Sequence, residues 1–153
     1  LAMLAGKLAA DSNSLAAIQD ASGLYHNYYS KQLNALIESD TGLITAGIIA
    51  FVQAIHLTHL EKLAPVFEVA GISTSDFTSD LKVLHRAEIV DLYNEEAVRI
   101  SDQSFSNFLI KYVFIEEKII PLSTMIATCF QLNQSRTIEE CDIILNVFLE
   151  WGV

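Results

Sequence analysis

A short segment near the middle of the chain has the pattern of a β-hairpin, whereas the segments on both sides have helical patterns. Residues 89–93 are rich in strand-forming side chains, residues 94–96 form a turn sequence, and residues 97–100 predict the return strand. On either side, apolar residues recur at spacings of three and four, as in helices that face a core. We therefore expect a mainly α fold with one small hairpin.

Three helices are predicted before the hairpin, at Gly42 to about Ile55, at His59–Ala70 and at Asp76–Ala87. Asp40-Thr41 is the capping sequence for the first, Ser75 or Asp76 caps the third, and Gly71 ends the second. Between the second and third helices, Ile72-Ser73 is predicted as a short extended link. Helix, helix, short strand, helix and hairpin is the order of a winged helix, so residues 41–100 predict a winged-helix unit.

Helical patterns also fill both ends of the chain. The predicted helices are Leu1–Ala10, Leu15–Ala21, Leu24–Glu38, a closing helix after Ser101-Asp102, one from Pro121 to about Asn133, and one after the capping box of residues 137–140. Gly23 marks a break between the second and third of these. A stripe of Leu24, Tyr25, Tyr28, Tyr29, Leu33 and Ile37 indicates core packing. The expected organisation is a helical lid-like segment at 1–40, a winged-helix domain with its closing helix at 41–118, and the start of a helical region at 119–153.

Composition excludes several classes of protein. Of the 153 residues 52% are hydrophobic and 18% are charged, which excludes a disordered chain. The longest nearly uninterrupted apolar run, Leu43–Val52, is ten residues long, whereas a spanning helix needs roughly 20, so no membrane segment is expected. The net charge of -10 repels nucleic acid and anionic lipid. Cys129 and Cys141 form no Cys-x-x-Cys pair, which favours a reducing, cytoplasmic location.

The two ends of the sequence predict a piece of a larger protein. A helical stripe is present from residue 1 with no capping residue before it, and the last residues are apolar. Apolar side chains at both ends are therefore expected to lack their partners and to drive self-association, namely Leu1, Leu4, Leu8, Phe148, Leu149 and Trp151.

The charges of the predicted winged helix disfavour DNA binding. Its third helix carries two basic and two acidic side chains, Lys82, Arg86, Asp76 and Asp80. Its hairpin has a net charge of -2, from Asp91, Glu95, Glu96 and Arg99. A groove-reading module usually concentrates positive charge on this face. We therefore expect the unit to pack against protein and to bind no nucleic acid.

No catalytic or metal motif is present in the sequence. His56 and His59 lie three apart with Glu61 nearby, but there is no His-Glu-x-x-His, and we interpret them as polar residues at helix ends. His26 and His85 are isolated. The chain contains neither Gly-x-Ser-x-Gly nor the Gly-x-x-x-x-Gly-Lys-Ser/Thr phosphate loop, so no enzymatic activity and no metal are expected for this chain.

Three segments together resemble a known class of proteins. Val98–Leu109, which follows the second strand and opens a helix, resembles the segment that closes the winged helix of the STAND class, the signal-transduction ATPases with numerous domains, which are related to AAA+ NTPases. In that class the segment commonly reads Met-His-Asp before an apolar helix. Leu1–Leu8 resembles the lid helix of the class, and Leu24–Glu38 is similar to the helix that precedes its winged helix. The resemblance covers about residues 1–118.

The resemblance implies a regulatory, non-catalytic role. In STAND proteins a P-loop ATPase domain precedes this region and helical repeats follow it. The lid and winged helix fold over bound ADP and couple the nucleotide state to a downstream sensor or effector, so ADP or ATP is expected only for the parent protein.

Residue by residue, Ile100 takes the Met position, Ser101 the His position that touches phosphate, and Asp102 the capping Asp. A serine carries no charge and reaches less far than imidazole, so plain helix capping by Ser101 or Asp102 is the alternative.

A second function is compatible with the same features. It is a winged-helix transcription regulator or protein-interaction module whose acidic surface binds another protein. A phosphate loop encoded upstream in the same reading frame distinguishes the STAND interpretation from this one.

Overall fold

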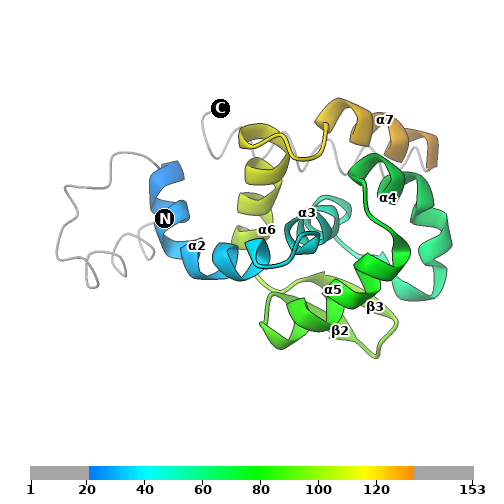
Figure 1. Cartoon of the computed structure of the whole chain (residues 1–153), viewed down its shortest axis with the longest axis horizontal. Helices are drawn as coiled ribbons and strands as arrows, with labels where there is room; N and C mark the ends of the chain where they lie inside the picture. Colours follow the sequence, from blue (N-terminus) through cyan, green and yellow to red (C-terminus); the bar gives the residue numbers. More distant parts are fainter. Residues whose placement is uncertain (1–20, 133–153) are drawn as a thin grey trace.

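The computed structural model describes residues 21–132, which are mainly helical with a small antiparallel sheet (Figure 1). The α-helices are α2 (Ala21–Ile37), α3 (Gly42–Val52), α4 (Ala64–Ala70), α5 (Thr74–Arg86), α6 (Gln103–Ile110) and α7 (Leu122–Leu132). A 3-10 helix, η1 (Leu57–Leu63), leads into α4, and a π-helix, η2 (Lys111–Glu116), continues α6. The strands are β1 (Ile55–His56), β2 (Val90–Tyr93) and β3 (Ala97–Ile100), in the order β1-β3-β2. The mainly helical class is therefore confirmed.

Helix α3 is the centre of the core and is surrounded by α2, α5, α6 and β3 (Figure 1). Its residues from Thr45 to Val52 are all buried, because this stretch is apolar on every side except for the Thr45 hydroxyl. The Phe51 ring lies 4.9 Å from that of Phe114. At Gly47 the backbone approaches η2 so closely that a Cβ would lie 2.9 Å from Val113 Cγ1. Helix α3 is thus a buried axis on which the other elements are assembled.

The predicted hairpin is confirmed. Strands β2 and β3 pair with Val90 opposite Ile100 and Leu92 opposite Val98. The turn between them has positive φ angles at Asn94 (50°) and Glu95 (58°), the geometry that a tight hairpin turn requires. The apolar side chains at positions 90, 98 and 100 are buried, so one face of the hairpin is part of the core.

The third strand lies elsewhere than the sequence predicts. Helix α3 ends at Val52 and not near Ile55, and Ile55–His56 forms β1, which pairs with Val98 and Ala97. The predicted extended link at residues 72–73 is not a strand of this sheet. A two-residue strand is defined by its long-range partner and leaves no periodic pattern in the sequence.

The cap of α5 also differs from the prediction. Ser73, and not Ser75 or Asp76, is the N-cap residue, and with Asp76 it forms a capping box. The Asp76 amide donates to Ser73 Oγ (3.1 Å) and the Ser73 amide donates to Asp76 Oδ2 (2.9 Å). Hydrogen bonds from the Ser73 side chain and backbone lower the pKa of Asp76. Gly71 ends α4 with φ 73°, as predicted.

Helix α2 runs through Gly23, so the predicted break there is wrong. A single glycine costs a helix only about 1 kcal/mol relative to alanine, which the packing of α2 exceeds. Tyr29 and Leu33 of the predicted stripe are buried, whereas Ile37 is 53% exposed and Leu36 faces the core in its place. The predicted helices within 1–20 and 133–153, the apolar side chains at both ends and Cys141 lie outside the described residues.

Hydropathy gives one further observation. Between residues 21 and 132, no single helix has both the length and the apolar character to cross a bilayer, and only α2 and α3 taken together, with a 120° bend between them, reach that composition.

Candidate functional site

Asp102 is the N-cap residue of α6. Its Oδ1 accepts hydrogen bonds from the amides of Ser104 (2.7 Å) and Phe105 (3.1 Å). Its other carboxylate oxygen lies 3.5 Å from the Tyr29 hydroxyl, which donates to it from α2. The capping role predicted for Asp102 is confirmed, and both oxygens of this carboxylate have protein partners.

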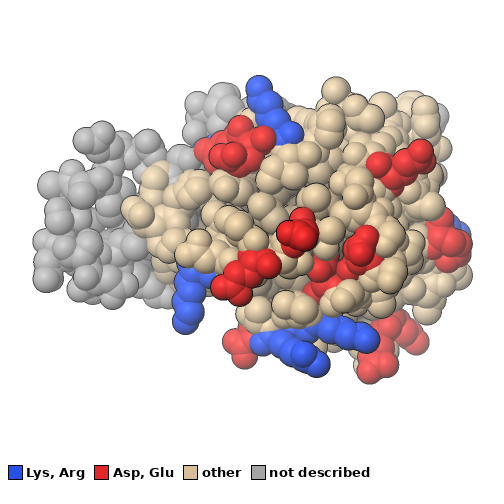
Figure 2. Space-filling view, in the orientation of Figure 1, with Lys and Arg blue, Asp and Glu red and all other residues tan. Residues whose placement is uncertain are grey.

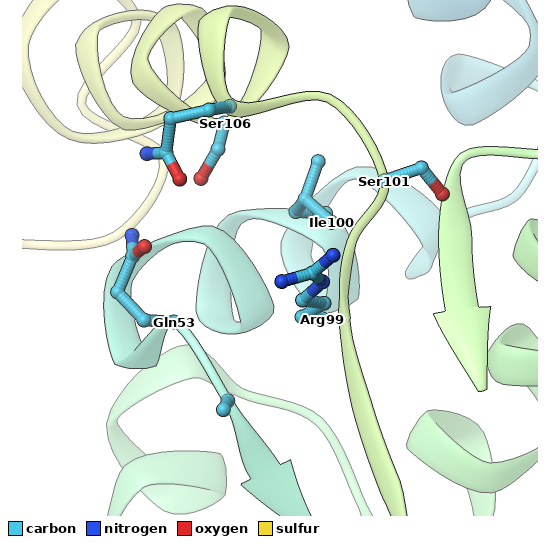
Figure 3. A pocket seen from close by; sticks show the side chains of 7 residues that line it. Gln53, Arg99, Ile100, Ser101 and Ser106 are labelled. Carbon is cyan, nitrogen blue, oxygen red and sulfur yellow. The ribbon is translucent and has the colours of Figure 1, made fainter. Parts of the chain in front are cut away.

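Ser101 is held against strand β2. Its hydroxyl donates to Asp91 Oδ1 (2.9 Å), and its amide donates to the carbonyl of Ile89 (3.0 Å). Figure 3 shows the Ser101 hydroxyl directed away from the space between Gln53 and Ser106. The side chain at the Met-His-Asp-like position is therefore already used to tie the end of β3 to β2.

A polar pocket of about 270 Å³ lies beside Ser101, where the end of α3, strand β3 and the start of α6 meet (Figure 3). The residues that line it are Gln53, Ala54, Arg99, Ile100, Ser101, Gln103 and Ser106. Among the described residues of this lining Arg99 is the one that carries a charge. The sequence analysis placed Arg99 in the return strand and counted its charge, but did not assign it to a site. The pocket brings together residues that are up to 53 positions apart, Gln53 and Ser106.

Arg99 has weak partners at the mouth of the pocket. Its Nε lies 4.0 Å from Asp91 Oδ2, and its guanidinium lies 5.1 Å from the centre of the Tyr93 ring. Both side chains of the Arg99–Asp91 pair are about half exposed, so water screens this ion pair. The same Asp91 carboxylate also accepts the Ser101 hydrogen bond. The guanidinium is thus positioned by its neighbours without a tight salt bridge.

A second polar cluster lies at the opposite end of α3 and is closed. Asp80 of α5 is 6% exposed, and three hydroxyls donate to its carboxylate. Thr41 and Thr45 donate to Oδ2 (2.7 Å each), and Ser39 donates to Oδ1 (3.1 Å). Ser39 Oγ in turn accepts from the Gly42 amide at the start of α3 (3.1 Å). The sequence predicted that Thr41 caps α3. Thr41 is the N-cap residue, but its hydroxyl bonds to Asp80 and makes no capping hydrogen bond.

The burial of Asp80 changes the charge of the outer face of α5. With Asp80 turned inward, the exposed side chains of this helix include Lys82, Val83 and Arg86. Figure 2 shows basic side chains along the lower edge of the molecule, where α5 and the hairpin lie, with acidic ones on either side. The even count of acids and bases in the sequence of α5 therefore does not describe its surface.

The histidines are dispersed. His59 Nδ1 lies 3.4 Å from Glu61 Oε1 at an exposed site, and His85 Nδ1 lies 3.2 Å from the Val90 carbonyl. His26 packs edge-on against Phe108 and Tyr112. Within the described part of the chain, no three His, Cys, Asp or Glu side chains lie close enough together to hold a metal ion.

Tyr112 and Lys111 lie in the π-helical segment η2. Burial, together with the nearby carboxylates of Glu117 and Glu116, raises the pKa of Tyr112. Lys111 is buried and its Nζ lies 2.6 Å from Glu116 Oε1. The ion pair spans η2 itself and stabilises this segment.

Comparisons of the chain with family models, with curated proteins and with solved structures found no match.

Sequence reasoning missed both polar clusters around α3. Ser39, Thr41 and Asp80 are ordinary polar residues in the sequence, and their convergence requires α5 to cross the start of α3. Gln53 and Ser106 likewise carry no motif. The one available signal was Ser106 itself, a polar residue inside the apolar pattern of the helix after Asp102.

Proposed function

We propose that residues 41–118 are a winged-helix-type regulatory unit of a STAND-type NTPase. The unit couples nucleotide state to neighbouring parts of the protein by packing and has no catalytic role of its own. The proposed partners are an upstream P-loop ATPase domain and downstream helical repeats of the parent protein, which holds ADP or ATP in a cytoplasmic setting.

The arrangement of elements supports the winged-helix assignment. Helix α3, strand β1, the helical pair η1–α4, helix α5 and the hairpin β2–β3 follow one another, and the sheet has the order β1-β3-β2. In this order β1 lies beside β3, and β2 is at the edge and in contact with α5, which is the position expected for a wing.

The observation that carries the regulatory part of the proposal is the junction between β3 and α6. Only Ser101 and Asp102 separate the strand from the helix, and both side chains hold the junction in place. We expect a helix joined to the hairpin in this way to move with it as one body. In the resembled class this junction lies beside the nucleotide, and movement of the unit reports the nucleotide state.

The test is a comparison of the 153-residue chain with the protein encoded by its whole reading frame. We expect the 153-residue chain to show no ATP turnover above background and no micromolar nucleotide binding by calorimetry. We expect the whole frame to encode a Gly-x-x-x-x-Gly-Lys-Ser/Thr loop and its product to bind ADP. Substitution Asp102→Ala in that product should speed ADP release, because it loosens the junction. A reading frame without the loop would overturn the proposal.

One observation favours the second candidate, a regulator or interaction module. The outer face of α5 presents Lys82 and Arg86 without Asp80 beside them. The acidic residues Glu95 and Glu96 in the hairpin turn still oppose a DNA backbone. We expect no nanomolar gel shift with DNA at about 150 mM salt, since non-specific binding alone is far weaker. A nanomolar shift that Lys82→Glu abolishes would favour the regulator.

A further inference from the structure

The pocket beside β3 has hydrogen-bonding capacity that the described chain does not use. We propose that it binds a compact phosphate group, either the free ion or the phosphate of a small ester, through the guanidinium of Arg99. The hydroxyl of Ser106 and the side-chain amides of Gln53 and Gln103 complete the site. The inference goes beyond the proposed regulatory function, because Ser101 lines the pocket but its hydroxyl is bound to Asp91, and Asp102 is not part of the lining.

Ser106 is the first reason for this assignment. It is 3% exposed and belongs to the pocket lining, and within residues 21–132 its hydroxyl has no hydrogen-bond partner. Figure 3 shows Ser106 on α6, opposite Gln53 at the end of α3, with the pocket between them. Buried hydroxyls are nearly always paired in folded proteins. A hydroxyl left free on the wall of a pocket therefore indicates a ligand that pairs with it.

The backbone at Gln53 is the second reason. Gln53 has φ 70° and ψ -53°, and the Ala54 amide donates to the Val52 carbonyl across it (2.9 Å), which makes a tight and strained γ-turn. Strain of this kind in a residue other than glycine is concentrated at binding sites. The turn directs the chain from α3 into β1 and leaves the Gln53 side chain on the pocket wall.

The charge of the pocket selects the ligand. The chain as a whole carries -10, yet the described lining has the cation Arg99 and no acidic side chain. The nearest carboxylate, Asp91, is bound by the Ser101 hydroxyl and lies 4.0 Å from the Arg99 Nε. A guanidinium of this kind, with five donors in a planar fork, pairs best with an oxyanion.

The mixture of donors and acceptors favours phosphate over carboxylate. The side-chain amide of Gln53 already donates one N–H to the Ala50 carbonyl (2.5 Å), and that of Gln103 donates one to Asn107 Oδ1 (3.2 Å). The donors left for a ligand are therefore Arg99, the serine hydroxyl and the second N–H of each amide, whereas the amide oxygens of Gln53 and Gln103 accept. At pH 7 the free ion, HPO₄²⁻ or H₂PO₄⁻, accepts through several oxygens and also donates from its P–OH, so it satisfies both kinds of partner. A phosphate monoester also accepts through three oxygens, but it keeps a P–OH only in the monoanion, below its second pKa of about 6. A carboxylate has two acceptor oxygens and no donor, and it leaves the glutamine oxygens unpaired. The pocket volume of about 270 Å³ is ample for a tetrahedral ion.

The experiment is a titration of the 153-residue chain with sodium phosphate at pH 7 and constant ionic strength. Backbone amide resonances of residues 99–106 are followed by NMR, with glycerol phosphate and acetate in parallel titrations. We expect saturable shifts with a dissociation constant on the order of a millimolar, since a single cation provides the charge. Tighter binding of the ester than of the free ion would support the proposal and identify an ester as the source. Tighter binding of the free ion would support it equally and identify that ion.

Three variants sharpen the result. Arg99→Gln should weaken phosphate binding roughly tenfold or more, and Arg99→Lys should weaken it less, because lysine retains the charge but not the fork. Ser106→Ala should weaken binding about threefold by removing one neutral hydrogen bond. Arg86→Gln, an exposed substitution on α5 away from the pocket, is the matched control and should leave binding unchanged.

Several outcomes would overturn the proposal. The first is the absence of saturation by phosphate at about 50 mM, far above the millimolar range expected from the pocket chemistry. The second is an equal loss of phosphate binding in Arg86→Gln and Arg99→Gln. The third is binding of acetate as tight as that of phosphate. Because none of these measurements involves a P-loop or ATP turnover, failure here is distinguishable from failure of the regulatory function.

Discussion

The two ends of helix α3 carry polar clusters of opposite character. At its start, Asp80 accepts from Ser39, Thr41 and Thr45, so donors and acceptor are matched inside the protein. At its end, the residues around Ser106 form the wall of a pocket, and within the described chain the hydroxyl of Ser106 has no partner. The first cluster joins α3 to α5 by hydrogen bonds, and the second has the character of a binding surface.

The difference lies in how the polar groups are satisfied and not in how deeply they are buried. Thr45 is 0% exposed and Ser106 is 3% exposed, so burial alone does not separate them. A buried polar group stabilises the fold when its partner is in the chain and destabilises it when that partner is missing. Removal of a polar group is therefore expected to lower the stability of the fold at the first cluster and not at the second.

The largest effect is expected for Asp80→Ala. This change leaves three hydroxyls at the start of α3 without their acceptor and separates α5 from α3. We expect a loss of about 3 kcal/mol in the free energy of unfolding, measured by urea denaturation followed by circular dichroism.

Two further variants test this expectation. Thr45→Val removes one hydrogen bond to the carboxylate and should cost about 2 kcal/mol. Asp40→Ala, an exposed acid next to the same cluster, is the control and should change stability by less than about 0.5 kcal/mol. Equal stability of Asp80→Ala and Asp40→Ala would contradict the view that the start of α3 is a closed cluster.

A smaller loss is expected in the middle of α3. Gly47→Ala places a Cβ 2.9 Å from Val113 Cγ1 and 3.1 Å from Cγ2, so α3 and η2 must separate. We expect about 2 kcal/mol of destabilisation, by thermal or urea unfolding.

The double variant Gly47→Ala/Val113→Ala is the control for this contact, because the shortened side chain at 113 relieves the clash. Its loss should be smaller than the sum of the two single losses. Additive losses would show that the contact between Gly47 and Val113 is not tight in solution.

The elements that were predicted correctly are those with local signals. The hairpin β2–β3 combines strand-forming residues with a turn sequence, Gly71 ends α4 in the left-handed region, and Asp102 precedes an apolar helix as a capping residue. In each case the residues that define the feature are neighbours in the sequence. The interactions that form such a feature act over a few residues, so the local sequence pattern is sufficient to predict it.

The features that were missed depend on distant partners. Strand β1 exists because Ile55 pairs with Val98, and the start of α5 was misplaced because Ser73, Ser75 and Asp76 are all acceptable caps by type. The residues that line the pocket are even farther apart in the sequence, because Gln53 and Ser106 meet only when α3, β3 and α6 have packed. The sequence placed Ser101 in the site, but the hydroxyl of Ser101 donates to the Asp91 carboxylate.

A modest effect is expected at the start of α5, in a capping box that lies on the surface and away from α3. Ser73→Ala should cost about 1 kcal/mol, as for other N-cap serines. Hydrogen bonds from Ser73 lower the pKa of Asp76 below its ordinary value of 3.8. Ionised Asp76 therefore stabilises the fold above that value, and its contribution is lost as the pH falls through the lowered pKa.

Urea midpoints measured from pH 7 down to pH 2 check this sign. The difference between the wild type and Asp76→Asn should be constant at neutral pH and shrink only in the acid range. If the difference instead grew as the pH fell, the hydrogen bonds between Ser73 and Asp76 would not be present in solution.

The smallest effect is expected for Ser106→Ala, and it separates the two ends of α3 most directly. Thr45→Val and Ser106→Ala each remove one buried hydroxyl, but only Thr45 has an acceptor among the described residues. In the absence of phosphate, Ser106→Ala should leave the urea midpoint unchanged or raise it slightly, because the variant no longer buries an unpaired hydroxyl. A loss as large as that of Thr45→Val would mean that Ser106 is satisfied within the protein. The pocket would then be a closed structural cluster like the one around Asp80, and the two ends of the helix would not differ in kind.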